Sequence, residues 1–585
     1  MDKKSILGFV LIFIIILLMQ PYYKLMNKNA PQAPKQVIKH EATEEIAPPS
    51  TDKLPTKSTS PQKNIISSGP KETYTIDTEL YKATISSEGG GTIKSFILKN
   101  YEMRKGGDTT LVQLINDNGK SPLLIRYISI DGDTVELNQN FKLNYVSKSS
   151  EIKDSFSISG DDSITMSFVL RNQNSVVAKK IFKFYGNKYT IGLDTDLTGL
   201  QNNSAANFYE LSWNGGLLYT ESFLKDDIFY SKAYAYSGGE FENLNVKSGK
   251  KKQSRSMGST RWTAIRTKYF AASFIPENPG IGYKLSGTGI PIQGNEFQKI
   301  FTMHLLLPLN SPSHTTIFIG PLDYSIIKGL SVNLEHIMTF GFKLIQPISK
   351  GILWTFIKLN TLIPNYGWVL IIFSILVKAV LSPLTNKSTR SMKEMQNLQP
   401  KIAALKEKYQ NDPQKINAAT MKLYKEHGVN PMGGCLPLLI QMPILIALFT
   451  VFRSTIELRH APFILWITDL SAPDTIFTLP FKIPIYGQNV NVLPLIMALT
   501  TVLQQKFTTA AASNNPQQKM MMYFMPIMMF FLFNQFPSGL NLYYTLFNIL
   551  SMIQQKFLQP KPKPKKVKKS AFQTFRQIQS KAKRK

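Results

Sequence analysis

The stretch Trp368-Val-Leu-Ile-Ile-Phe-Ser-Ile-Leu-Val-Lys378-Ala-Val-Leu-Ser-Pro383 decides how this chain is organised. Apart from one lysine it carries no charged residue, and the apolar run of about 366–386 that contains it has the length that a bilayer core of about 30 Å requires. The mean hydropathy of the 585 residues is nevertheless only −0.10, because apolar residues gather at the N-terminus and after about residue 340. Residues 23–340 resemble soluble protein in composition. The sequence therefore predicts a membrane protein with a large globular part.

Further apolar runs of spanning length complete the membrane part. A first run near the N-terminus has two lysines before it and ends in Tyr22 and Tyr23, without a cleavage site of small residues, so we interpret residues 1–24 as an uncleaved transmembrane anchor. We predict a polytopic α-helical membrane protein with six transmembrane helices, of which five form a core at 366–557. The five core spans are expected at about 366–386, 434–454, 491–508, 519–535 and 538–557.

Between the anchor and the core, the composition changes twice. Residues 25–70 are rich in Pro, Lys, Ser and Thr and predict a disordered linker. Residues 71–325 show short alternating runs such as Tyr74–Asp77, broken by Gly89–Gly91 and many turn residues, without an amphipathic helix. This pattern predicts a large antiparallel β-sandwich. The single cysteine, Cys435, excludes an intrachain disulfide, so this domain depends on its own core.

Three further segments are helical or basic. Residues 326–365 predict connecting and interfacial amphipathic helices, because the apolar stretch after Ile348 is interrupted by Pro364 before the first core span. Residues 387–430 predict a charged hairpin of two helices that turns at Asn411-Asp412-Pro413. Residues 558–585 form a basic tail.

The distribution of charge predicts the orientation. The formal charge of +30 would suit a nucleic-acid binder, but most Lys and Arg residues flank apolar spans, as cytoplasmic loops do under the positive-inside rule. We therefore expect an inner-membrane protein with cytoplasmic termini and a periplasmic sandwich. For the tail alone we expect a contact with ribosomal RNA or anionic lipid, through Lys565, Lys566, Lys568, Lys569, Lys583 and Arg584.

Lys378 is the most informative residue of the core. Eight residues separate it from Asn386, which places its Cα about 12 Å below the cytoplasmic edge of the span. A charge at that depth costs a few kcal/mol and normally faces a wet cavity or the bundle interior. No Asp or Glu lies within the five spans to pair with it. The sequence thus predicts an unpaired, hydrated ammonium, and the missing carboxylates disfavour a proton-coupled transporter.

Other polar residues repeat at helical spacing on the core spans and could converge on this charge. The alternative is that they only hydrogen-bond to neighbouring helices and hold the bundle together. The predicted substrate groove consists of Lys378, Ser374, Ser382, Gln441, Gln504, Asn541, Tyr544 and Asn548.

Methionines mark a second, apolar surface. Their flexible side chains suit packing against many different apolar partners, although simple lipid contact explains any single one equally well. The predicted hydrophobic slide consists of Met442, Ile446, Met525, Met528 and Met529.

Catalytic patterns are missing from the sequence. The six histidines lack ligand spacing, and Ser538 has no base near it in the sequence. We therefore expect no metal, no cofactor and no enzymatic activity.

Several phrases closely resemble the YidC/Oxa/Alb family of membrane protein insertases, in its Gram-negative form with a large periplasmic domain. The resemblance covers about 340–557 and extends more weakly to the sandwich around Thr78–Ser86. The phrases are Leu398-Gln-Pro-Lys401, the stretch from Tyr424 to Pro443, Glu457-Leu-Arg-His-Ala-Pro-Phe463, Trp466-Ile-Thr-Asp-Leu-Ser-Ala-Pro-Asp474 and Phe536-Pro-Ser-Gly-Leu540.

The resemblance implies a groove open to the cytoplasm and the lipid but closed toward the periplasm. It also implies that a basic residue, usually Arg, attracts acidic residues of the client at the position of Lys378, with Ser374 and Tyr544 in the groove. Lysine keeps the charge but loses the planar fork that grips a carboxylate with two bonds.

The expected function is that of an insertase and membrane chaperone, acting alone or with a Sec-type translocon. The expected partners are nascent membrane proteins, the ribosome and membrane lipids, with a monomer as the working unit. A small-molecule transporter or channel is the alternative, and a membrane-bound hydrolase ranks third.

Overall fold

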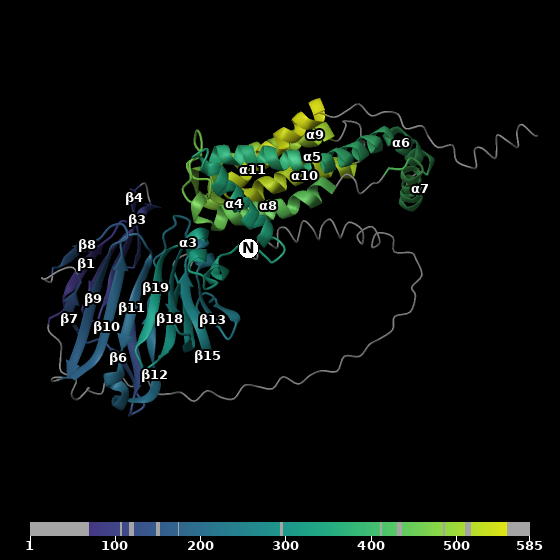
Figure 1. Cartoon of the computed structure of the whole chain (residues 1–585). Helices are drawn as coiled ribbons and strands as arrows, with labels where there is room; N and C mark the ends of the chain where they lie inside the picture. The colour runs from purple at the N-terminus through teal and green to yellow at the C-terminus, as the bar shows by residue number, and fades with distance from the viewer. Residues whose placement is uncertain are drawn as a thin grey trace, which may run out of the picture. The chain divides into compact units, whose positions relative to one another are not determined.

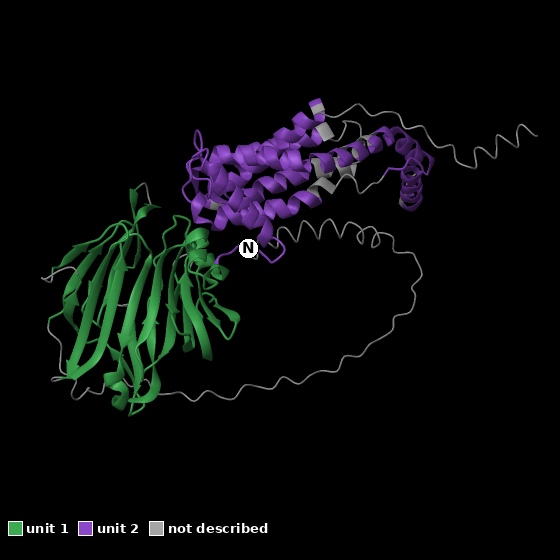
Figure 2. Cartoon of the chain, viewed as in Figure 1, with its two compact units in different colours: residues 1–337 green, residues 338–585 purple. Residues whose placement is uncertain are grey.

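The structure is a computed structural model that describes residues 70–105, 108–115, 122–147, 153–172, 175–292, 297–409, 412–429, 436–483, 486–508 and 516–558. The predicted anchor, the linker up to residue 69 and the tail from residue 559 lie outside the described residues. The chain divides into two compact units, 1–337 and 338–585 (Figure 2).

The first unit consists of antiparallel β-sheets, as predicted (Figure 1). Its smaller sheet has the order β4 (Asp108–Ile115), β3 (Thr92–Lys105), β2 (Tyr81–Ser86), β1 (Thr73–Asp77) and β8 (Ser155–Ser157), of which only the β1–β8 pair is parallel. The alternating burial along β1 and β2 follows from the alternating sequence, because successive strand side chains point to opposite faces.

Most of the remaining strands join one large sheet. Its order is β6 (Thr134–Leu137), β5 (Leu124–Ser129), β12 (Ser204–Trp213), β18 (Phe297–Pro308), β17 (Gly280–Pro291), β15 (Lys251–Arg266), β16 (Phe270–Pro276), β19 (Ser313–Pro321), β11 (Thr190–Asp196), β10 (Ser175–Tyr185), β9 (Ser163–Asn172) and β7 (Lys142–Val146). The hairpin of β13 (Lys232–Ser237) and β14 (Glu240–Leu244) adds to β15. Short helices lie between strands: η1 (Thr198–Asn203) and α2 (Leu224–Tyr230), the second of which the sequence pattern did not indicate.

The two sheets pack through aromatic side chains and a glycine turn. The ring of Tyr74 on β1 meets that of Phe168 on β9 with centroids 6.0 Å apart. A Cβ atom at Gly91 would lie 2.4 Å from the Phe182 ring, and Gly91 has a φ of +103°, so the close approach requires glycine there.

A fully buried lysine lies beside this glycine turn. Lys180 Nζ donates to the carbonyl oxygens of Gly89, at 3.1 Å, and Leu123, at 2.8 Å. Both acceptor residues have left-handed backbones, with φ of +63° and +68°. Burial lowers the pKa of Lys180 to about 7.

The first compact unit extends to Ile337 and thus includes the short helices that follow the last strand. Helix α3 (Tyr324–Gly329) and η2 (Leu334–Ile337) follow the last strand. The buried Arg266 donates to the carbonyl of Ile337 at 2.6 Å, and the indole of Trp262 donates to that of Val332 at 2.9 Å. Two buried donors on β15 therefore hold this segment to the sheet.

The second unit is a helical bundle. Helix α4 packs on α5 and α8, and α11 packs on α5, α8 and α9, while α10 packs on α9. Its helices are α4 (Gln346–Asn360), α5 (Tyr366–Asn397), α6 (Gln399–Lys408), α7 (Pro413–Glu426), α8 (Leu436–Ser454), α9 (Leu493–Thr508), α10 (Pro516–Phe533) and α11 (Ser538–Ile553).

These helices occupy every predicted core span within the described residues. One of them, over Tyr366–Ser388, is long and apolar enough to cross a membrane, and Leu439–Ser454 and Tyr523–Phe533 are shorter apolar helices. Large apolar side chains such as Val380, Leu495 and Ile527 point outward without protein neighbours to cover them. A bundle with such a surface suits lipid as its surroundings.

The hairpin predicted at 387–430 starts on a continuation of the first core helix, because α5 runs unbroken to Asn397. Helices α6 and α7 then fold back on one another around Leu398, Ile402 and Val429. Asp412 caps α7 by accepting bonds from the backbone N–H groups of residues 414 and 415.

Candidate functional site

Lys378 lies inside the bundle, with 9% of its surface exposed. Its Nζ donates to Ser551 Oγ on α11 at 2.6 Å and lies 4.4 Å from the centre of the Phe547 ring. The prediction concerned the lack of a carboxylate partner and did not anticipate that a hydroxyl and an aromatic face contact the ammonium. The hydroxyl lies on the neighbouring helix at the same depth, which the spacing along one helix does not reveal. Among the described residues no carboxylate pairs with Lys378.

The contacts leave Lys378 with unused capacity. A lysine ammonium has three N–H donors, and Ser551 accepts one of them. The Ser551 hydroxyl in turn donates to the carbonyl of Phe547 at 2.6 Å. The contact with the Phe547 ring is an electrostatic attraction and does not use one of the N–H groups as a hydrogen-bond donor. Two donors of Lys378 thus remain for other acceptors.

A second polar cluster follows Lys378 along the same helices. Gln554 Nε2 donates to Ser382 Oγ and to Asn386 Oδ1, both at 2.8 Å. The sequence analysis missed Gln554, although it follows Ser551 at a spacing of three residues and so shares its helix face. Its contacts bring the predicted residue Ser382 to the same α5–α11 interface as Lys378.

Asn548 joins α11 to a different helix. Its side-chain amide donates to Thr501 Oγ1 at 2.9 Å and to Thr500 Oγ1 at 3.3 Å on α9. Both threonine hydroxyls also donate to the carbonyl of Met497. Asn548 therefore behaves here as the alternative interpretation expected, as a bond between helices.

Within the described residues, Lys378 forms no hydrogen bond with six of the predicted groove residues: Ser374, Ser382, Gln441, Asn541, Tyr544 and Asn548. Ser374 is buried and donates to the carbonyl of Leu370 in its own helix, and Gln504 is half-buried on α9. Asn541 donates to the carbonyl of Phe533 at 3.3 Å, and Tyr544 lies buried with its ring 6.0 Å from that of Phe533.

Two buried amides have polar atoms without a partner. Gln441 Nε2 on α8 and Asn541 Oδ1 on α11 accept or donate no hydrogen bond within the described part of the chain. A buried polar atom without a partner costs about 1–3 kcal/mol. Such atoms suit a position that water or a client segment can reach.

The predicted hydrophobic slide is partly at the surface. Met442 and Ile446 on α8, and Met525 and Met528 on α10, are half-buried, whereas Met529 is buried and does not face outward. Within the described residues, α8 packs on α4, α5 and α11, whereas α10 packs on α9.

The end of the bundle away from the α6–α7 hairpin is closed by aromatic rings. Phe449 of α8 and Phe533 of α10 both contact Phe536, with centroids 4.8 Å apart in each case. The loop before α9 adds to this end, because Ser538 Oγ donates to the carbonyl of Asp469 at 2.7 Å. A Cβ at Gly539 would lie 2.3 Å from the Phe452 ring, which accounts for glycine in the Phe536–Leu540 motif.

The same loop organises the start of α9. One carboxylate oxygen of Asp474 accepts bonds from the backbone N–H of Leu493 at 2.7 Å, the backbone N–H of Val492 and the indole of Trp466, both at 3.1 Å. Burial raises the pKa of this carboxyl group, while these three bonds oppose the rise.

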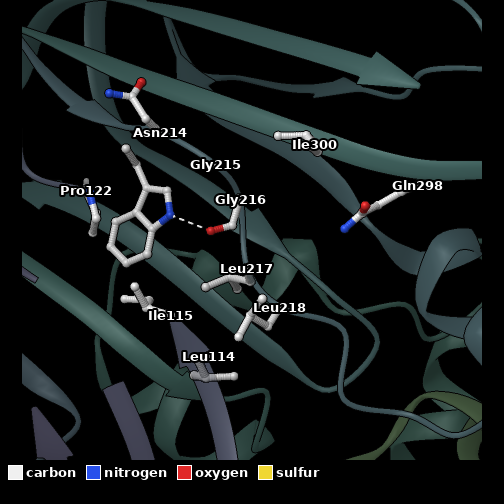
Figure 3. A pocket seen from close by; sticks show the side chains of 11 residues that line it. Leu114, Ile115, Pro122, Asn214, Gly215, Gly216, Leu217, Leu218, Gln298 and Ile300 are labelled. Atoms are coloured by element: carbon white, nitrogen blue, oxygen red, sulfur yellow. Dashed lines mark hydrogen bonds between the residues drawn. The ribbon is translucent and has the colours of Figure 1, made fainter. Parts of the chain in front are cut away.

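A pocket of about 230 Å³ lies in the first unit (Figure 3). Figure 3 shows it between the segment from Asn214 to Leu218 and the β18 residues Gln298 and Ile300. The buried Trp213 beside it donates to the carbonyl of Gly216 at 2.9 Å. The lining residues carry two amides and no charged side chain, so the pocket offers no acid, base or nucleophile. Within the described residues no group of three or more His, Cys, Asp or Glu side chains could hold a metal ion.

Two family models match this chain. A family model described as the YidC periplasmic domain matches residues 73–355, and one described as the 60Kd inner membrane protein matches residues 358–566. A solved structure of an active YidC insertase is 20% identical and covers 84% of this chain and 94% of its own, with a TM-score of 0.37.

The curated relatives cover nearly the whole chain. The membrane protein insertase YidC of Chlorobaculum parvum is 37% identical and that of Chlorobaculum tepidum 36% identical, each covering 95% of this chain and 94% of the relative. The protein of the same name from Chloroherpeton thalassium is 34% identical and covers 95% of this chain and 96% of its own length. On this similarity, the chain belongs to the YidC family of membrane protein insertases.

Proposed function

We propose that this chain inserts and folds integral proteins of the inner membrane, and that it acts both as an insertase and as a membrane chaperone, alone or with a Sec-type translocon. The observation that carries the proposal is Lys378: a buried cation in an apolar bundle, with one donor used and no carboxylate partner among the described residues. A cation of this kind is expensive to keep in a membrane and is retained for function.

The proposed topology has six transmembrane helices. The anchor at 1–24 and helices α5, α8, α9, α10 and α11 span the membrane, and both termini lie in the cytoplasm. Support comes from the basic residues on the α5–α8 side of the bundle and in the tail, under the positive-inside rule. The sandwich then lies in the periplasm and the α6–α7 hairpin in the cytoplasm.

The proposed mechanism lowers the cost of moving a polar segment across the membrane. A short hydrophilic segment of the client enters from the cytoplasmic side, where Lys378, Ser382 and Gln554 offer donors in place of water. Acidic groups of the client bind the two free donors of Lys378. The aromatic end formed by Phe449 and Phe536 limits leakage toward the periplasm.

The hydrophobic segment of the client then leaves sideways into lipid. An exit between α8 and α10 is supported by the half-buried side chains of Met442, Ile446, Met525 and Met528. No covalent step is required, because the hydrophobic effect drives the segment into the bilayer. Lysine in place of the family's usual arginine suits attraction at a single point rather than a two-bond grip.

The proposed partners are nascent membrane proteins, lipids, a Sec-type translocon and the ribosome. The basic tail, with residues such as Lys568 and Arg584, binds ribosomal RNA or anionic lipid electrostatically. The chain works as a monomer.

The test is site-specific photo-crosslinking to a stalled nascent chain of a small membrane protein. Probes at Ser374, Gln441 and Tyr544 are each compared with a matched exposed position on the same helix: Ile375, Leu439 and Ile549. Crosslinks at all three buried positions support a client path through the polar interior. Crosslinks only at the exposed controls would contradict that path and favour the transporter or channel alternative.

A further inference from the structure

The loop between α8 and α9 carries a two-stranded ribbon that exposes three large apolar side chains among uncharged polar ones. Strands β20 (Thr475–Ile483) and β21 (Gly487–Asn491) pair with each other and with no other sheet in the described residues. Ile476, Phe477 and Phe481 are 57%, 54% and 60% exposed. A lone two-stranded ribbon is marginally stable in water, and three large apolar side chains on its surface would weaken it further.

The charge pattern separates this ribbon from strands that face water. Between Phe463 and Val492 the charged residues are Asp469, Asp474 and Lys482, and Asp474 is buried as the cap of α9. By contrast, the exposed first part of β15 reads Lys251-Lys252-Gln253-Ser254-Arg255. The first part of β15 thus exposes mainly basic and polar side chains, with Met257 as an exception, whereas the ribbon exposes isoleucine and phenylalanine.

Residues of the ribbon contact the last turns of α10 in the bundle. The ring of Tyr486, beside the ribbon's tip, lies 5.4 Å from Phe530 and 5.7 Å from Phe531 on α10. Asn534 Nδ2 donates to the carbonyls of Tyr486 and Asn489, at 3.1 and 2.7 Å. Phe530 and Phe531 lie near the end of α10 at Phe533, so Tyr486 holds the ribbon against this part of the helix.

A second apolar group lies beside the ribbon in the same loop. Leu465 is 82% exposed and has a φ of +56°, a backbone conformation that leucine rarely adopts. The neighbouring Trp466 binds Asp474, the residue directly before β20. A strained backbone that holds an apolar side chain outward indicates that the side chain has a use there.

We propose that the β20–β21 ribbon and Leu465 insert into the interfacial layer of the membrane and anchor this end of the bundle to lipid. The inference rests on the proposed membrane topology but not on the groove. The lipid surface is the partner because the ribbon connects two membrane helices, carries little charge and reaches the side of α10. The ribbon stays at headgroup depth, since the open edge of β20 would leave backbone polar groups unsatisfied in hydrocarbon.

The experiment measures membrane depth at single labelled cysteines in the full chain. In a Cys435→Ser background, a fluorophore sensitive to polarity is placed at 481, with Arg255 as the aqueous control and Val380 as the deep lipid control. The protein is reconstituted without client into vesicles of phosphatidylethanolamine and phosphatidylglycerol. Quenching is measured with iodide on both sides, and with lipids that carry a spin label near the headgroup or at the acyl-chain end.

The label at 481 should be protected from iodide and quenched most strongly by the shallow spin label. A Phe477→Ser/Ile476→Ser variant should move the label at 481 toward iodide. Iodide access equal to that at 255 would overturn the proposal. Protection of the label from iodide that rises with protein density, without quenching by lipid, would also overturn the proposal, because it indicates contact with a second copy. Quenching at 481 equal to that at the deep control would overturn it too. If the label at 380 also fails to contact lipid, the proposed membrane topology is wrong. Failure of the client crosslinking experiment would not change the expected quenching at 481, because the ribbon proposal does not depend on the groove.

Discussion

The two units each bury a lysine, and the two lysines are held in opposite ways. Lys180 in the sandwich donates to two backbone carbonyls and is fully buried, whereas Lys378 in the bundle donates to one hydroxyl and lies over one ring. The two acceptor carbonyls belong to turn residues whose backbone N–H groups are themselves bonded, whereas a serine hydroxyl can rotate. The comparison indicates that Lys180 serves the fold and that Lys378 remains available to a client.

The largest expected effect is charge reversal at Lys378. Lys378→Glu should lower insertion of a client with an acidic translocated segment at least ~10-fold, because like charges now meet in a poorly hydrated place. Lys378→Ala should impair the same client less, and Lys378→Arg should preserve activity. Insertion is measured by protease protection of the client in reconstituted vesicles. A client without acidic residues is the control, and equal activity of the alanine and wild-type chains on the acidic client would refute a role for the charge.

Removing the other lysine should damage the fold instead. Lys180→Ala should reduce the free energy of unfolding of the sandwich by about 3 kcal/mol, because it leaves a cavity and two buried carbonyls without donors. Hydrogen exchange of peptides from β10 in the full chain measures the loss. Lys378→Ala serves as the matched control and should leave exchange in β10 unchanged. A Lys180→Ala chain with wild-type exchange would show that the carbonyls do not depend on the ammonium.

The pH dependence of the sandwich should reveal the same lysine. The pKa of Lys180 is about 7 in the folded chain and 10.5 in its ordinary state, so between these values the unfolded chain binds more protons than the folded one. Stability from this group should therefore rise as pH increases from about 7 to about 10, by at most ~1.4 kcal/mol per unit. The observable is the difference between wild type and Lys180→Met, which cancels other groups. A difference that is flat across this range would contradict the lowered pKa.

The smallest effect is expected at the hydroxyl partner of Lys378. Ser551→Ala should reduce insertion of the acidic client by no more than ~3-fold, since a neutral partner contributes little and the ammonium keeps its charge. The same vesicle assay measures it. If Ser551→Ala were as harmful as Lys378→Ala, the lysine would act mainly by tying α5 to α11, and its contrast with Lys180 would disappear.

Sequence patterns predicted the elements of both units better than their contacts. Alternating runs such as Tyr74–Asp77 indicated strands, and the apolar run around Lys378 indicated a long helix, because burial on one face or all round leaves a period in the sequence. The bond from Arg266 to the carbonyl of Ile337 was not predicted, since the two residues lie far apart along the chain. Strand order in the large sheet was likewise inaccessible to local patterns.

The candidate site divides in the same way. The spacing of Ser374, Lys378 and Ser382 identified a polar face, but it could not say that Ser551 and Gln554 complete it from another helix. Met529 was predicted to belong to the hydrophobic slide from the methionine-rich composition of its span, and packing buries its side chain. Periodicity in the sequence predicts which residues share one face of a helix. Which neighbouring helix packs against that face depends on the arrangement of the whole bundle.

The turn around Lys180 has a consequence for how this sequence can vary. Gly89 and Leu123 both adopt left-handed backbones, and both present a carbonyl to the same ammonium. A lineage that lost the lysine would have no reason to keep leucine in that costly conformation, and one that kept it could replace Leu123 by glycine or asparagine at little cost. Residues at positions 89, 123 and 180 should therefore covary among related sequences, whereas residues of the surrounding strands should vary independently of one another.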